Sequence, residues 1–155
     1  DIPIFYVRKG KRGTGYISRN DVKKSQKLID SWKVLIPSAG SDASSVPDYV
    51  LSTPIIAPSP SVCTQTYLFF VLGSENEAKS VHSYLSTKFL RFLVSLRKIT
   101  QHATRSTYEW VPMQDWNQEW SDDLLYAKYG LNDIEKEFIE NSIKSVSWPT
   151  VLSNA

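Results

Sequence analysis

The 155-residue sequence has a single cysteine, Cys63, and only two histidines, His82 and His102. One cysteine excludes an intramolecular disulfide framework and a multi-cysteine zinc site. The two histidines form no metal-binding motif, so we expect all three residues to be packed or surface positions. The longest apolar run, residues 67–72, has the length of a strand, far below the roughly 18 residues of a membrane span. A disulfide scaffold and a membrane-spanning helix are both excluded as descriptions of this sequence.

The first residues lack the features of a signal peptide. The chain begins at Asp1 without an initiator methionine, and residues 1–7 contain neither a basic leader nor a small-residue cleavage site. We therefore interpret the chain as a piece of a longer intracellular protein and expect a cytoplasmic location. A piece of this kind can lack the catalytic part of its parent.

Acidic residues are scarce in the first two thirds of the chain. Residues 1–105 contain 15 Lys and Arg against 7 Asp and Glu, whereas residues 106–155 contain 3 against 9. The net charge of +2 therefore averages a basic segment and an acidic one. A basic segment of this size favours a surface that binds a polyanion, and the alternative is a solvated positive face.

β-Branched and aromatic residues predict strands in the first half of the chain. We expect them over residues 1–8, 33–36 and 62–72, with shorter strands at 16–17 and 108–111. Three glycines and a dense basic cluster predict a turn over residues 9–15. Four prolines between residues 47 and 60 confine that stretch to loops and edge strands.

The clearest helical pattern covers residues 75–101, where apolar residues recur at steps of three or four. We expect its core face to contain Leu85, Phe89, Phe92 and Leu96. Ser86 and Thr87 could restart the helix, so two collinear pieces are an alternative to one long helix.

Capping residues predict two further helices in the acidic segment. Ser121 precedes the first, Gly130 follows it, and Asn132 with Glu135 forms a capping box for the second. The apolar face of the second helix is Ile134, Phe138, Ile139 and Ile143. We therefore predict one α+β domain with a mixed, twisted β-sheet core and one long packed helix in residues 1–112, followed by a small helical appendage in residues 113–155.

One weak motif is typical of metal-dependent restriction nucleases. Pro47-Asp48 followed by Glu77-Ala78-Lys79 matches a pattern in which two carboxylates hold a divalent ion and a lysine lies beside the attacked phosphate. In such nucleases the second carboxylate and the lysine lie on a strand, whereas here they begin the predicted helix. A nuclease remains an alternative function. The glycines of residues 9–15 match neither the dinucleotide nor the P-loop spacing.

Several blocks of sequence, in order, resemble a known family. They are TGYIS (14–18), KVLIPSAG (33–40), SVCTQTYL (61–68), SYLSTKFLRFLV (83–94), RKITQ (97–101), WVP (110–112) and the segment 120–139. Together they are similar to the C-terminal target-recognition domain of adenine-specific restriction–modification methyltransferases, including fused type IIG enzymes. They are more distantly similar to the specificity subunits of type I restriction enzymes.

The resemblance implies that the chain recognises a short sequence in double-stranded DNA while a neighbouring domain of the parent methylates adenine. The parent would use S-adenosylmethionine and flip the target base. Neither the methylase signature nor a cofactor-binding glycine motif occurs in this chain. The resemblance therefore assigns a binding role, with DNA and the parent's methyltransferase domain as partners, and no catalytic residue, metal or cofactor.

The basic residues supply the candidate DNA contacts. We expect phosphate contacts from Lys9, Lys11, Arg12, Lys88, Arg91 and Lys98. We expect base-edge contacts from Arg12, Lys33, Ser38 and Ser41, because loops on a rigid sheet usually carry recognition. The long helix should be a scaffold, and the acidic helices should face away from DNA. A third interpretation is a protein-interaction module that pairs chains head to tail through opposite charges.

Overall fold

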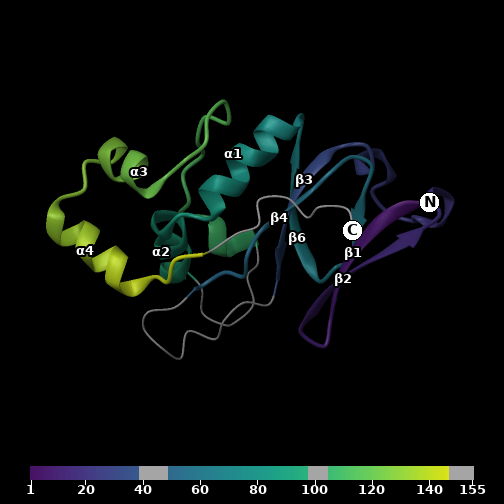
Figure 1. Ribbon diagram of the computed structural model, residues 1–155, viewed down its shortest axis with the longest axis horizontal. Helices are drawn as coiled ribbons and strands as arrows, with labels where there is room; N and C mark the ends of the chain where they lie inside the picture. Colours follow the sequence, from purple (N-terminus) through teal and green to yellow (C-terminus); the bar gives the residue numbers. More distant parts are fainter. Residues whose placement is uncertain (39–48, 98–104, 147–155) are drawn as a thin grey trace.

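The computed structural model describes residues 1–38, 49–97 and 105–146. Within these residues the chain forms two three-stranded sheets and four α-helices, arranged side by side along the long axis (Figure 1). The β-hairpin at the N-terminus lies at one end of this axis, and the last two helices lie at the other (Figure 1). The predicted α+β class is confirmed.

The first sheet has the strand order β2-β1-β5. β1 (Ile2–Arg8) and β2 (Lys11–Ile17) form an antiparallel hairpin, and β5 (Val62–Cys63) pairs in parallel with β1. The turn expected over residues 9–15 is therefore only two residues long, because residues 11–15 belong to β2. Two short 3₁₀ turns, η1 (Arg19–Asp21) and η2 (Gln26–Leu28), connect this hairpin to the second sheet.

The second sheet is antiparallel with the order β4-β3-β6. Its centre is β3 (Trp32–Pro37), which lies between β4 (Ile55–Ala57) and β6 (Tyr67–Leu72). The prediction of a buried strand at residues 33–36 is confirmed. The single strand expected over residues 62–72 is divided between the two sheets, because the Tyr67 amide bonds back to the Thr64 carbonyl and turns the chain.

The long predicted helix is two helices, α1 (Glu75–Leu85) and α2 (Lys88–Arg97). The Thr87 hydroxyl accepts the Leu90 amide at 3.2 Å, so Thr87 caps the start of α2. The Asp122 carboxylate accepts the amides of Lys88 at 3.2 Å and of Phe89 at 2.9 Å. The first amides of α2, which have no partner inside the helix, are thereby satisfied. The alternative with a restart at Ser86 and Thr87 is the one observed.

The C-terminal helices are α3 (Asp122–Lys128) and α4 (Asp133–Ser142). Their predicted caps are confirmed: Ser121 accepts the Leu124 amide, and Asn132 and Glu135 form a reciprocal capping box. Gly130 has a φ of +62° after α3, a conformation that glycine adopts without strain. The predicted apolar face of α4 is only half buried, since Ile139 and Ile143 are inside while Ile134 and Phe138 are exposed.

The larger hydrophobic core joins the second sheet to all four helices. It includes Trp120, Leu125 and Ile139, so the C-terminal segment packs into the same core as α1 and α2. A smaller cluster fills the space between the two sheets, with Phe5, Leu35, Ile55, Ala57 and Tyr67. None of the helices in the described ranges is long and apolar enough to cross a membrane.

Two sequence expectations about this region are wrong. Leu96 is 53% exposed, because α2 extends past the core at its C-terminal end, whereas Leu85 and Phe89 are buried as expected. Residues 108–111 are not a strand. The segment begins with a 3₁₀ turn, η3 (Arg105–Tyr108), and the amides of Glu109 and Val111 bond to carbonyls three residues earlier, as in turns.

Candidate nucleic-acid interface

The β1–β2 turn gathers four cations. Lys9 and Gly10 have φ angles of +48° and +73°, and these positive values at both turn residues are typical of a type I′ hairpin. The register pairs Arg8 with Lys11 and Val7 with Arg12. The side chains of Arg8, Lys9, Lys11 and Arg12, which we call the tip cations, are all exposed.

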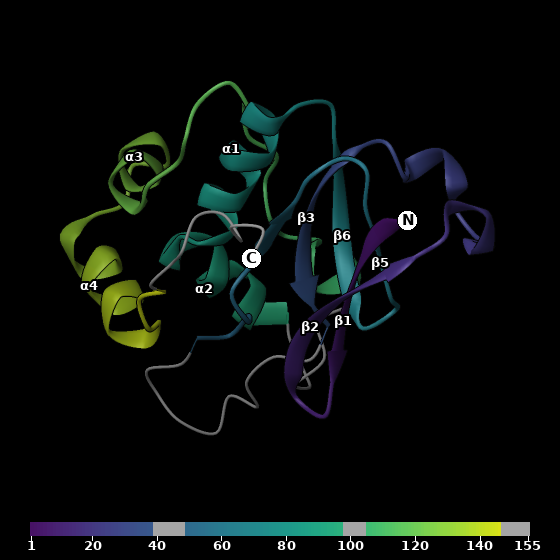
Figure 2. The same cartoon turned by 45° about the vertical axis from the view of Figure 1, so that its right-hand side comes forward.

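The hairpin is stiffened along its length and anchored at one point. Tyr6 lies opposite Gly13, where a Cβ atom would be 2.5 Å from the tyrosine ring, so only glycine lets the ring cover the β2 backbone. The Val7 amide donates to the Thr66 hydroxyl at 3.1 Å, which ties β1 to the connection between β5 and β6. Figure 2 shows the turn end of the hairpin extending past the ends of β3 and β6.

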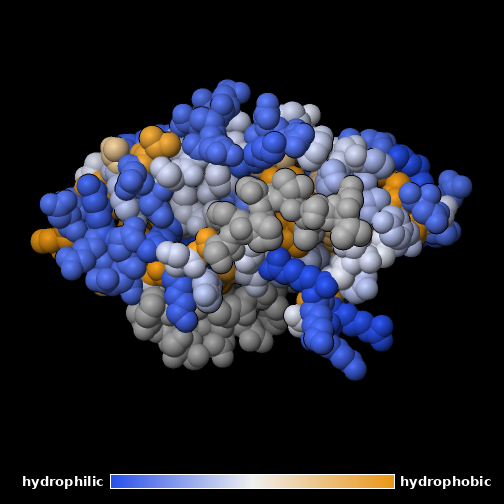
Figure 3. Space-filling view, in the orientation of Figure 1, coloured by the Kyte–Doolittle hydropathy of each residue, from blue (hydrophilic) through white to orange (hydrophobic). Residues whose placement is uncertain are grey.

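The tip cations form no ion pair with an acidic residue in the described part of the chain. Among the residues that the structure describes, five ion pairs form, and none of them includes a tip cation. In Figure 3 strongly hydrophilic side chains project from the lower right of the molecule, where Figure 1 shows the hairpin turn. The positive charge of this turn is thus available to an anionic partner.

A second group of exposed cations follows β2, at the opposite end of the hairpin. It consists of Lys23, Lys24 and Lys27. Arg19 in the same segment is occupied, because it forms two hydrogen bonds of 2.6 and 2.8 Å with Asp30. These bonds raise the pKa of Arg19 and lower the pKa of Asp30.

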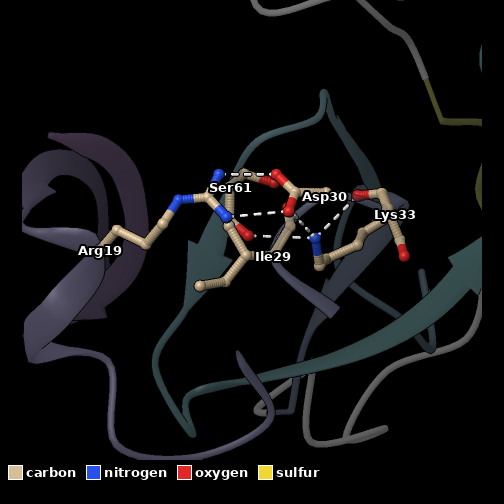
Figure 4. A network of polar contacts seen from close by, with 6 residues as sticks. Arg19, Ile29, Asp30, Lys33 and Ser61 are labelled. Atoms are coloured by element: carbon tan, nitrogen blue, oxygen red, sulfur yellow. Dashed lines mark hydrogen bonds and ion pairs between the residues drawn. The ribbon is translucent and has the colours of Figure 1, made fainter. Parts of the chain in front are cut away.

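Lys33, expected near base edges, is a buried structural residue. Its side chain is 4% exposed, and its ammonium group donates to the carbonyls of Ile29, Ser31 and Ser61 at 3.3, 2.8 and 3.0 Å (Figure 4). Burial lowers its pKa. The three carbonyls use all three ammonium protons, so the prediction of a base-edge contact from Lys33 is wrong.

Arg91, expected at a phosphate, is fully buried at 0% exposure. Its guanidinium donates to the carbonyls of Leu85 at 3.1 Å, Tyr49 at 2.7 Å and Ser52 at 3.4 Å, and also to that of Leu51. The residue fastens the segment that leads to β4 onto α2. A phosphate cannot reach it, and this prediction is wrong as well.

The other predicted residues have varied surroundings. Lys88 forms an ion pair of 2.5 Å with Glu140 and is mostly covered. Burial would raise the pKa of Glu140, but hydrogen bonds from Lys88 and Tyr126 hold it below its usual value. The Ser38 hydroxyl donates to the Thr66 carbonyl at 3.1 Å, which places it beside the hairpin anchor. Ser41 and Lys98 lie outside the described residues.

The nuclease motif is only partly visible. Asp48 lies outside the described residues. The Glu77 carboxylate accepts the Gly73 amide at 2.7 Å, next to the Ser74 cap of α1, and Lys79 pairs with Glu75 at 3.1 Å. In the described part of the chain no three His, Cys, Asp or Glu residues are placed to hold a metal ion.

Comparisons of the chain with protein-family models, with curated proteins and with solved structures gave no match. The candidate interface therefore rests on its geometry. Lys9, Lys11 and Arg12 lie together at the hairpin turn, and the structure adds Arg8 to them. The sequence did contain a signal for Arg8. Lys9-Gly10 suits a two-residue hairpin turn, and such a turn brings the flanking residues Arg8 and Lys11 together.

Proposed function

We propose that this protein binds double-stranded DNA through the turn of the β1–β2 hairpin, as the target-recognition domain of a restriction–modification adenine methyltransferase. The observation that carries the proposal is the set of tip cations, which are exposed and free of described acidic partners at the end of an anchored two-stranded ribbon. A ribbon of this width fits the major groove of DNA, where base edges can be distinguished.

Each end of the hairpin has a separate role in this proposal. Arg8, Lys9 and Lys11 contact phosphates beside the groove, and Arg12 has the forked donor geometry that matches a guanine edge. β2 has seven residues at about 3.3 Å each, so its far end, which leads into the segment with Lys23 and Lys24, lies roughly 20 Å from the tip. That separation exceeds the major-groove width of about 12 Å and lets the lysines contact phosphates on the far side of the groove.

The opposite end of the molecule serves the parent enzyme. α3 and α4 carry most of the acidic segment and lie at the end of the long axis remote from the hairpin (Figure 1). Negative charge there disfavours DNA and suits contact with a basic surface of the parent's methyltransferase domain. That domain supplies S-adenosylmethionine and the catalytic residues in the cytoplasmic parent.

Duplex binding at two salt concentrations tests the proposal. Fluorescence anisotropy with a panel of labelled duplexes at 50 and 200 mM salt should show affinity that falls steeply with salt and differs between sequences. Changing all four tip cations to Gln should reduce the slope of log affinity against log salt by about 3, because each of the three proposed phosphate contacts contributes about 0.9. Binding by this variant that equals wild type would contradict the proposal.

A charge-matched control separates the hairpin from net charge. Lys79, Arg97, Lys136 and Lys144 lie outside the hairpin, and changing these four to Gln removes the same charge. This variant should keep most of the salt slope. Magnesium-dependent cleavage that is lost in Asp48→Ala would instead favour the nuclease, and dimerisation without DNA binding would favour the interaction module.

A further inference from the structure

A cavity of about 450 Å³ lies between β5 and β6, beside the segment that follows β2. This volume is within the range of small-molecule sites. Buried residues line its inner part: Ile29, Lys33, Ser61 and Tyr67. Exposed residues line its rim, among them Lys23, Lys24, Gln65 and Phe69. The cavity is thus enclosed on one side and open to solvent on the other.

Two of the inner residues have buried hydroxyl groups without a hydrogen-bond partner. Ser61 is 0% and Tyr67 is 4% exposed, and neither hydroxyl is bonded within residues 1–38, 49–97 and 105–146. Burial of a hydroxyl without a partner is unfavourable, and such groups are uncommon in folded proteins. Two of them lining one cavity indicate a ligand that supplies the missing partners.

The charges nearby define the polarity of that ligand. The Lys33 ammonium is saturated by carbonyls, so it contributes positive potential but no free proton. Arg12 is close enough to Tyr67 for its charge to lower the pKa of that hydroxyl, although burial is the stronger effect and raises it. With positive charge around them, the two hydroxyls act best as donors to the acceptor atoms of a ligand.

The residues at the rim favour a ligand that has a planar ring and a negatively charged group. Phe69 exposes its side chain there and can stack against a planar ring. Lys23 and Lys24 form no ion pair with any carboxylate that the structure describes, although Asp21 also lines the cavity. A heterocycle with carbonyl acceptors and an attached phosphate satisfies the inner part and the rim together.

We propose that this cavity binds a single nucleotide. The carbonyl oxygens of its base accept hydrogen bonds from Ser61 and Tyr67, its ring stacks on Phe69, and its phosphate contacts Lys23 and Lys24. A free nucleotide and one nucleotide of a bound strand share this chemistry. Lys23 and Lys24 take part in both proposals, whereas Ser61, Tyr67 and Phe69 belong to this one and the tip phosphate contacts to duplex binding, so each proposal can fail without the other.

Calorimetric titration with nucleoside monophosphates tests the site. Thymidine monophosphate has two base carbonyls and should bind more tightly than deoxyadenosine monophosphate, which has none, and than inorganic phosphate. Ser61→Ala and Tyr67→Phe should each weaken thymidine monophosphate binding about 5-fold to 10-fold. Neither should lower the unfolding temperature of the free protein, because each removes a hydroxyl that lacks a partner.

The rim lysines provide a matched pair of variants. Lys24 lines the cavity and Lys27 does not, although both are exposed in the same segment. Lys24→Gln should weaken nucleotide binding severalfold while Lys27→Gln leaves it unchanged. No binding of thymidine monophosphate at millimolar concentration would overturn the proposal. So would equal affinities for the adenine and thymine nucleotides, or a lower unfolding temperature in both hydroxyl variants.

The variant with Gln at all four tip cations distinguishes a free nucleotide from a nucleotide within a bound strand. If a thymine oligonucleotide displaces thymidine monophosphate from this variant, the cavity accepts a nucleotide within a strand. If only the free nucleotide binds, the cavity is a site for a mononucleotide. The difference in duplex binding between wild type and this variant reports on the tip cations, because Lys23 and Lys24 are the same in both.

Discussion

Arg12 at the hairpin turn and Arg91 inside α2 carry the same group in opposite surroundings. Arg12 is exposed and has no described acidic partner, whereas Arg91 is 0% exposed and donates to four backbone carbonyls. The comparison shows that a basic residue can be buried even where the sequence around it has few acidic residues to pair with it. Backbone carbonyls, which no composition reveals, can satisfy it in the interior.

Arg91→Leu should have the largest effect on stability. The substitution leaves several buried carbonyls without their donor, and we expect a loss of about 3 to 5 kcal/mol in the free energy of unfolding, as for other broken buried charge networks. Urea unfolding followed by circular dichroism measures it. The control is Arg97→Leu, whose exposed ion pair with Glu109 should be worth less than about 1 kcal/mol. Similar losses of unfolding free energy in the two variants would contradict this prediction.

Lys33 should show a smaller effect that depends on pH. Burial lowers its pKa in the folded protein below the ordinary lysine value of 10.5, so the unfolded state binds the proton more tightly. Wild-type stability should therefore rise, relative to Lys33→Met, as pH increases through the folded pKa towards 10.5. The rise is about 1.4 kcal/mol for each unit by which folding lowers the pKa. Unfolding of both proteins between pH 8 and 10.5 measures it, and parallel stability curves would refute it.

The tip cations should have the smallest effect on stability. Lys11→Gln and Arg12→Gln remove exposed charges that make no described ion pair, so each should change the free energy of unfolding by less than about 0.5 kcal/mol. Denaturant midpoints measured at one salt concentration check this. A loss above 1 kcal/mol in either variant would show that the hairpin turn uses its charge for folding.

Elements specified by neighbouring residues were predictable from the sequence. The caps of α3 and α4 depend on Ser121, Asn132 and Glu135, which act on amides three residues away or less. β2 was missed because its glycines are typical of turns, and only the Tyr6 ring across the hairpin explains Gly13 in a strand. Periodicity also showed which residues of α2 share a face, but not that the core ends before Leu96.

The residues of the candidate site likewise include some that neighbouring sequence predicts and others that depend on distant contacts. The grouping of Lys9, Lys11 and Arg12 follows from their closeness in sequence to one turn. The roles of Lys33 and Arg91 depend on carbonyls up to 42 residues away, which no local pattern encodes. The cavity that contains Ser61 and Tyr67 likewise requires two sheets to be brought together.

The hydrogen bonds that the Asp122 carboxylate accepts from the Lys88 and Phe89 amides have a consequence for synthesis of the chain. The ribosome makes α2 and its Thr87 cap before it makes Asp122, which accepts the first two amides of α2 and follows Lys88 by 34 positions. A nascent chain that stops short of α3 therefore has α1 and α2 without a complete junction between them. We expect these helices to become resistant to protease only after residue 122 has left the ribosome, so that the last third of the chain determines when the middle third finishes folding.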